Sequence, residues 1–178
     1  SGLPSSGEWF FFSADATGRQ YVGQSGAVSP ISGGDALIMD SSTSAVYATN
    51  ESTLLVDLAS TGGGILKYWF KETGDENEPE DGVFLSDGVT EIQLQSHQHG
   101  PSVWTEYTID LGQAASMGGM TLTNAMRIIF RQRDNYPVPT DGHLIDDISV
   151  FAPAPTNGQP SRPGIAAFDI NNAINVNS

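Results

Sequence analysis

Short apolar segments recur about every ten residues along the chain, and glycine or proline separates them. The clearest is residues 103–111, in which the odd-numbered side chains are apolar or threonine and most of the even-numbered ones are polar. A period of two is typical of a β-strand that buries one face. The pattern therefore predicts an all-β protein: an antiparallel two-sheet β-sandwich of roughly nine or ten strands, with less than about a tenth of its residues in helices.

Further segments have the length and residue types of strands: 9–12, 35–40, 52–59, 65–72, 83–86, 90–95, 125–131 and 144–151. Asp87 and Gly88, between two of them, predict the tight turn of a hairpin. Residues 18–34 are rich in glycine and are expected to form turns, and 113–124 a loop or one short helical turn. The predicted core includes Leu37, Leu55, Leu66, Trp69, Phe84, Tyr107, Ile109, Ile128, Phe130 and Ile148.

Acidic residues outnumber basic ones 21 to 7, which gives the chain a formal charge of −14. Such a charge repels nucleic acids and anionic membrane surfaces, so neither is an expected partner. The chain has no cysteine, and no apolar run of about 18 residues that would span a membrane. This composition predicts a secreted or cell-surface protein, and we expect a prokaryotic source.

The composition changes after residue 152, so residues 1–152 are predicted to form the sandwich domain. Four prolines follow within eleven residues, and they favour an extended linker over 153–164. In 165–178 the apolar side chains have one parity, which predicts an amphipathic strand with no hairpin partner beside it. Its apolar members are Phe168, Ile170, Ile174 and Val176.

Two adjacent carboxylates, Asp146 and Asp147, interrupt the apolar segment 144–151. Since neighbouring side chains of a strand point to opposite faces, one of the two is expected to point into the core. A buried carboxylate requires a partner, and the sequence leaves two open. One is an arginine of the preceding strand: Arg127, Arg131 or Arg133. The other is Ca²⁺, bound by backbone carbonyl oxygens and by carboxylates from Asp146, Asp147, Asp40, Asp35 and Asp81.

Four segments resemble, in this order, the bacterial MAM-like or laminin-G-like jelly-roll domains of secreted proteins: DGVFLSDG (81–88), VWTEYTIDL (103–111), MRIIFRQRDNYPVPTDG (126–142) and HLIDDISVF (143–151). The last segment is the most specific of them. The resemblance implies a two-sheet jelly roll, often with a structural Ca²⁺, in proteins used for adhesion, glycan binding or assembly. It carries over no catalytic residues, and the cysteine pairs usual in MAM domains are absent from this chain.

The sequence does not predict an enzyme. A serine–histidine–aspartate triad built on Ser96 or Ser102 would have no nucleophile elbow, and no strand carries paired carboxylates in a glycosidase pattern. His97 and His99 could hold Zn²⁺ or Ni²⁺ if the loop between them were extended. Trp104 and Tyr136 are candidates for stacking on sugar rings, because aromatic faces pack well on apolar surfaces.

Two functions follow as predictions. The first is a non-enzymatic structural subunit that polymerises head to tail, each copy donating its C-terminal strand to the next copy. The alternative is a carbohydrate-binding module or adhesin domain of a secreted polysaccharide-active protein, with Trp104 and Tyr136 in contact with the glycan.

Overall fold

The computed structural model describes residues 8–24, 29–74 and 77–153, which form one β-sandwich. These residues contain ten strands and one short helix. In chain order they are β1 (Trp9–Ser13), β2 (Gly18–Gly23), β3 (Ala36–Ser41), β4 (Ala48–Val56), β5 (Ile65–Thr73), β6 (Gly82–Ser86), β7 (Glu91–Ser96), β8 (Thr105–Asp110), α1 (Leu111–Met117), β9 (Met126–Asp134) and β10 (Gly142–Phe151).

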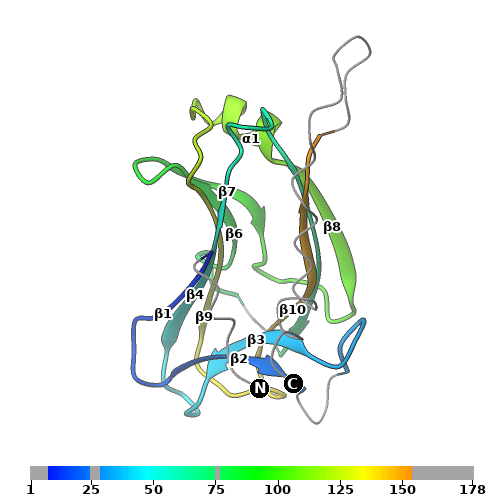
Figure 1. The fold of residues 1–178 in the computed structure, drawn as a ribbon. Helices are drawn as coiled ribbons and strands as arrows, with labels where there is room; N and C mark the ends of the chain where they lie inside the picture. Colours follow the sequence, from blue (N-terminus) through cyan, green and yellow to red (C-terminus); the bar gives the residue numbers. More distant parts are fainter. Residues whose placement is uncertain (1–7, 25–28, 75–76, 154–178) are drawn as a thin grey trace.

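The strands form two antiparallel sheets of five strands each. Sheet A has the order β1-β4-β9-β6-β7, and sheet B has the order β2-β3-β10-β5-β8. Figure 1 shows sheet A at the left and most of sheet B at the right, packed face to face. The predicted all-β jelly-roll sandwich is therefore confirmed. Within the described ranges no helix has the length and apolar character needed to cross a membrane.

The inward side chains of both sheets form one hydrophobic core. Half of the predicted core residues belong to it, and Tyr107 and Ile109 pack against it from the edge strand β8. The prediction is wrong for Leu55 and Trp69, which lie on the outer faces because their strand neighbours take the inward positions. Phe84 is buried, as predicted, but on the outer side of sheet A beneath Arg131. The five confirmed members are Leu37, Leu66, Ile128, Phe130 and Ile148.

Several connections cross from one sheet to the other. β4 and β5 are consecutive in the chain but lie in different sheets, and so are β9 and β10. The arginines of β9 therefore lie on sheet A, whereas Asp146 and Asp147 lie on sheet B. The interpretation that pairs these carboxylates with an arginine of the preceding strand is wrong, because 135–141 carries the chain across the sandwich.

β10 contains a β-bulge between Asp146 and Ser149. Asp147 has a φ of 49°, in the left-handed region that aspartate tolerates better than most residues. The extra residue reverses the alternation, so that Ile145 before the bulge and Ile148 after it both point into the core. One of the two carboxylates, Asp146, is buried as predicted, but it lies on the outer side of sheet B and not in the core.

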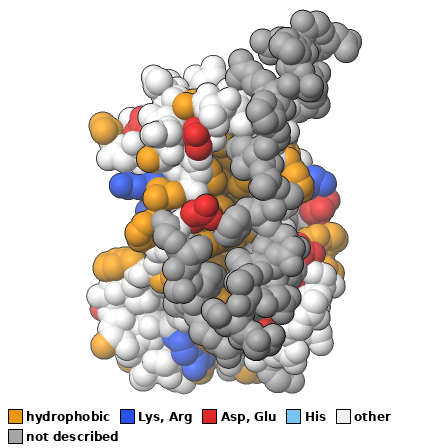
Figure 2. All heavy atoms as spheres, in the orientation of Figure 1, with side chains coloured by type: hydrophobic (Ala, Val, Ile, Leu, Met, Phe, Trp, Pro, Cys, Tyr) orange, Lys and Arg blue, Asp and Glu red, His pale blue; other side chains and the backbone are white. Residues whose placement is uncertain are grey.

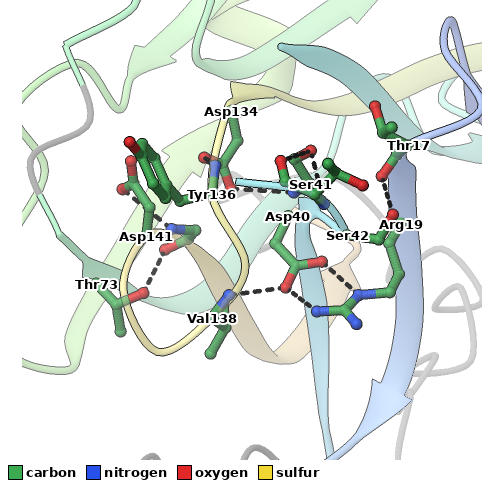
Figure 3. A network of polar contacts seen from close by, with 12 residues as sticks. Thr17, Arg19, Asp40, Ser41, Ser42, Thr73, Asp134, Tyr136, Val138 and Asp141 are labelled. Carbon is green, nitrogen blue, oxygen red and sulfur yellow. Dashed lines mark hydrogen bonds and ion pairs between the residues drawn. The ribbon is translucent and has the colours of Figure 1, made fainter. Parts of the chain in front are cut away.

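β2 is a strand that the sequence reading did not predict, because it is short of apolar residues (GRQYVG). It pairs with β3 along its whole length and is further held by Arg19. The Arg19 guanidinium donates to Asp40 through Nε, at 2.7 Å from Oδ1, and through Nη2 to Oδ2. Asp40 also accepts a 2.8 Å hydrogen bond from the backbone N–H of Val138, as Figure 3 shows. One buried carboxylate thus joins β2, β3 and the loop between β9 and β10.

Candidate functional site

The outer face of sheet A carries the three most exposed aromatic side chains of the described residues. Phe10 and Phe12 on β1 are 53% and 58% exposed, and Tyr47, just before β4, is 45% exposed. The two phenylalanines face outward because Trp9 and Phe11, the alternate residues of β1, pack on the core.

Strand pairing arranges polar side chains in rows beside these rings. Phe12 lies opposite Glu51, and Glu51 lies opposite Arg131. The next row runs across the whole sheet through Phe10, Thr53, Ile129, Phe84 and Gln93. Neighbouring strands are about 4.8 Å apart, so a ligand a few ångströms wide on either phenylalanine would reach the polar groups of β4 and β9.

Arg131 is the most constrained polar group of this face. Its Nε donates to Glu51 at 2.6 Å, and its Nη1 and Nη2 donate to the two carboxylate oxygens of Glu91 at 2.9 and 3.1 Å. The guanidinium lies 4.3 Å from the ring centre of Phe84, which is buried beneath it. Two carboxylates and a ring therefore hold Arg131 in one orientation, so it need not be ordered when a ligand binds.

Arg133 is held by an aromatic contact instead. Its guanidinium lies 4.1 Å from the ring centre of Tyr47, a cation–π distance. Its backbone N–H donates to Asp81 at 2.6 Å, which fixes this part of β9. The face thus combines exposed rings with positioned donors and acceptors, the two kinds of group that recognise the apolar and hydroxyl surfaces of a sugar.

Figure 2 shows hydrophobic and basic side-chain atoms close together along the left outline of the molecule, on the side formed by sheet A. At the right outline, on the side of sheet B, basic and acidic atoms lie together.

The sequence-predicted glycan contacts, Trp104 and Tyr136, do not lie on sheet A. Trp104 is half-buried against Ile38 and Leu144 on the outer side of sheet B, and its Nε1–H donates to the Ser29 carbonyl at 3.0 Å. Tyr136 lies in the loop between β9 and β10, where its backbone N–H donates to Asp134 at 2.9 Å (Figure 3). A sugar-binding role for either residue stays a prediction from the sequence.

The five predicted calcium ligands have other partners. Asp40 binds Arg19, and Asp81 accepts from the backbone of Arg133. Asp146 accepts from the N–H groups of Ile31 and Ser32 at 2.9 and 3.3 Å, and Asp147 accepts from the Ser32 hydroxyl at 2.6 Å.

Asp35 is half-buried just before β3. In the part of the chain that the structure describes, no three histidine, aspartate or glutamate side chains form a group that could hold a metal ion. The five carboxylates thus do not form a common shell as they stand, and calcium binding stays a prediction. His97 is buried whereas His99 is exposed, so the two imidazoles do not share a site.

A cluster of buried polar groups lies inside the sandwich. The Nε2 of His97 is 3.0 Å from the hydroxyl of Tyr68, and its ring stacks on Phe70. His143 Nε2 lies 3.8 Å from Asp81 Oδ2, which is too far for a hydrogen bond. Within the described ranges, neither of these two atoms has a hydrogen-bond partner. Burial lowers the pKa of His143 to about 3 and raises the pKa of Asp81 to about 8. Both groups are therefore mainly uncharged at pH 7.

The comparisons with known proteins find the fold but no family. No family model matches the chain, and no curated protein matches it. A solved structure of a family 61 carbohydrate-binding module in complex with β-1,4-galactotriose is similar, with a TM-score of 0.56 and 18% identity over 85% of this chain and 92% of the other. The cleaved adhesin domain of Lys-gingipain from Porphyromonas gingivalis has a TM-score of 0.52 and 16% identity over 86% of this chain and 94% of the other. Both likenesses concern the fold, and neither singles out the MAM or laminin-G family.

Proposed function

We propose that this domain binds polysaccharide through the outer face of sheet A and does no chemistry on it. The observation that carries the proposal is the combination on one face of two phenylalanines, more than half exposed, with an arginine that two carboxylates hold in place. Exposed apolar side chains gathered on one face are typical of a ligand or partner site.

The fold supports this proposal. The similar structures are a carbohydrate-binding module with bound galactotriose and an adhesin domain, which are binding proteins by their descriptions. Domains of these kinds act outside the cell or at its surface, in agreement with the location predicted from the composition. If the domain is an adhesin, it would use the same face to bind a glycan attached to a cell surface instead of a free polysaccharide.

Replacing Phe10 and Phe12 together by serine is expected to weaken binding to a soluble polysaccharide by about fivefold to 150-fold, since two ring contacts contribute about 1–3 kcal/mol. Affinity electrophoresis against a panel of neutral and acidic plant and microbial polysaccharides would identify a ligand first, and calorimetry would then give its Kd. The thermal unfolding temperature should change little, because both rings are already more than half exposed.

Val103→Ser is the matched control, because it removes an apolar side chain that is 67% exposed, ahead of β8 in the other sheet. It should leave the affinity unchanged. Binding to no member of the panel, or equal loss of affinity in the control, would contradict the proposal.

Head-to-tail assembly through residues 165–178 is a separate prediction from the sequence. The segment lies outside the described residues, as do Phe168, Ile170, Ile174 and Val176. If it is a donated strand, the full chain should form concentration-dependent polymers in sedimentation velocity, and deletion of 165–178 should leave a folded monomer. A full-length chain that stays monomeric at high concentration would contradict assembly without affecting glycan binding.

A further inference from the structure

The basic residues of this acidic chain are unevenly distributed. Arg127, Arg131 and Arg133 all lie on β9 and all point to the outer side of sheet A, because the residues that alternate with them, such as Met126, Ile128 and Phe130, point into the core. Three of the seven basic residues of a chain with a net charge of −14 therefore share the face of the exposed phenylalanines. Among the outward side chains of the five strands of this sheet, they meet only two carboxylates, Glu51 and Glu91.

The three arginines differ in whether a carboxylate neutralises their charge. Glu51 and Glu91 both bind Arg131, so its charge is already compensated. Arg133 stacks on Tyr47 and, within the described ranges, forms no ion pair; Arg127 is exposed and forms none there either. Six residues of strand separate these two, which is about 20 Å at 3.3–3.4 Å per residue. Two available guanidinium groups thus flank the compensated centre of the face.

We infer that the ligand of this face is an acidic polysaccharide, whose anionic groups bind Arg127 and Arg133 while the sugar rings contact Phe10 and Phe12. This inference rests on the proposed function. A guanidinium presents a planar set of donors that matches a carboxylate or sulfate group, and its contact with Tyr47 already orients Arg133.

The negative charge of the whole chain does not oppose this binding at physiological salt. Exposed charges are screened beyond about 8 Å at 0.15 M ionic strength, so the local arginines determine the interaction with a bound polymer. The test is therefore done at this ionic strength, where repulsion from distant acidic residues is small.

The experiment compares polymers that share a backbone and differ in charge. Polygalacturonate is compared with its methyl ester, and dextran sulfate with dextran, by affinity electrophoresis and calorimetry on the full chain. We expect the charged member of at least one pair to bind at least about tenfold more tightly than its neutral partner. The first pair reports on carboxylates and the second on sulfates, so the result identifies which acidic group the face accepts.

The Arg127→Gln and Arg133→Gln double variant should lose this preference, with less than about a twofold change in affinity for any neutral polymer that binds. Lys67→Gln with Lys71→Gln is the matched control, since it removes the same number of positive charges from sheet B. It should leave the preference intact.

Three results would overturn the inference: equal or tighter binding of the neutral members, a preference that survives in the double arginine variant, or an equal loss in the lysine control. A neutral polysaccharide that binds through Phe10 and Phe12 would overturn the inference and support the proposed function. Binding to no polysaccharide, charged or neutral, would contradict both.

Discussion

Replacing Arg19 by methionine is expected to lower the free energy of unfolding at pH 7 by about 3 kcal/mol. The substitution leaves the Asp40 carboxylate, which is fully buried, without its charged partner, and breaking a buried ion pair in this way costs about 3–5 kcal/mol. The lower end applies because the Arg19 side chain is 40% exposed, so that water can reach the site once the guanidinium is gone. Urea denaturation followed by tryptophan fluorescence would measure the change.

Two variants test the cause of this loss. Adding Asp40→Asn to Arg19→Met removes the unpaired charge and should recover part of the stability. Lys67→Met breaks the pair with Glu106, whose side chains are 42% and 44% exposed, and should cost less than about 1 kcal/mol. A cost for Arg19→Met no larger than that for Lys67→Met would show that Asp40 does not depend on its partner.

Between pH 6.5 and pH 9 the protein is expected to lose roughly 2 kcal/mol of stability through the single carboxyl of Asp81. Burial raises the pKa of this group from 3.8 to about 8, so the folded state holds a proton that the unfolded chain has released. A raised carboxyl pKa contributes stability that is complete below about pH 4 and is lost as the pH rises through about 8.

The buried histidines act in the opposite direction at lower pH. The pKa of His143 falls from 6.5 to about 3 and that of His97 is also lowered by burial, so their contribution is lost as the pH falls below 6.5. Burial also raises the pKa of Asp134, to about 6, and this group loses stability in the other direction, as the pH rises from about 4 to about 6. Above about pH 7.5 the titrations of both histidines and of Asp134 are nearly complete, so the slope there comes mainly from Asp81.

Asp81→Asn should abolish the loss of stability between about pH 7.5 and pH 9. The amide cannot ionise, its oxygen can still accept from the Arg133 N–H, and its NH₂ can donate toward His143 Nε2. Asp87→Asn is the control, since hydrogen bonds from the backbone N–H groups of Thr90 and Val89 lower the pKa of Asp87 and it titrates well below this range. A wild-type profile without a slope, or the same slope in Asp81→Asn, would exclude the carboxyl as the cause.

The strands could be predicted from the sequence more fully than the faces they present. Alternation identified β8, and Asp87 and Gly88 identified the β6–β7 hairpin, because these signals are local. The outward positions of Trp69 and Leu55 could not be predicted in the same way, since their segments are apolar on both faces and only the pairing partner decides which face is buried. The bulge at Asp147 reversed the parity of β10 for the same reason: it depends on the register with β5.

The candidate site was missed although a signal for it exists. The run from Trp9 to Phe12 consists of four aromatic residues, and a strand must place half of them on each face. The run was predicted only as a strand, without assigning its two faces, and Phe10 and Phe12 were therefore missed. The arginines of β9 were examined as partners for Asp146 and Asp147, whereas the sheet crossing of 135–141 places them on the opposite side, beside Glu51 and Glu91.

The two strands that occupy the middle of the sheets, β9 in sheet A and β10 in sheet B, are the last two strands of the residues that the structure describes. Of the eight strand pairings, only β2–β3 and β6–β7 join consecutive strands, so most of the structure depends on contacts distant in sequence. During synthesis, neither sheet can close until residues 126–151 have left the ribosome, and for a secreted chain the same delay extends through export. The central strand of each sheet is therefore among the last of the described strands to become available for pairing.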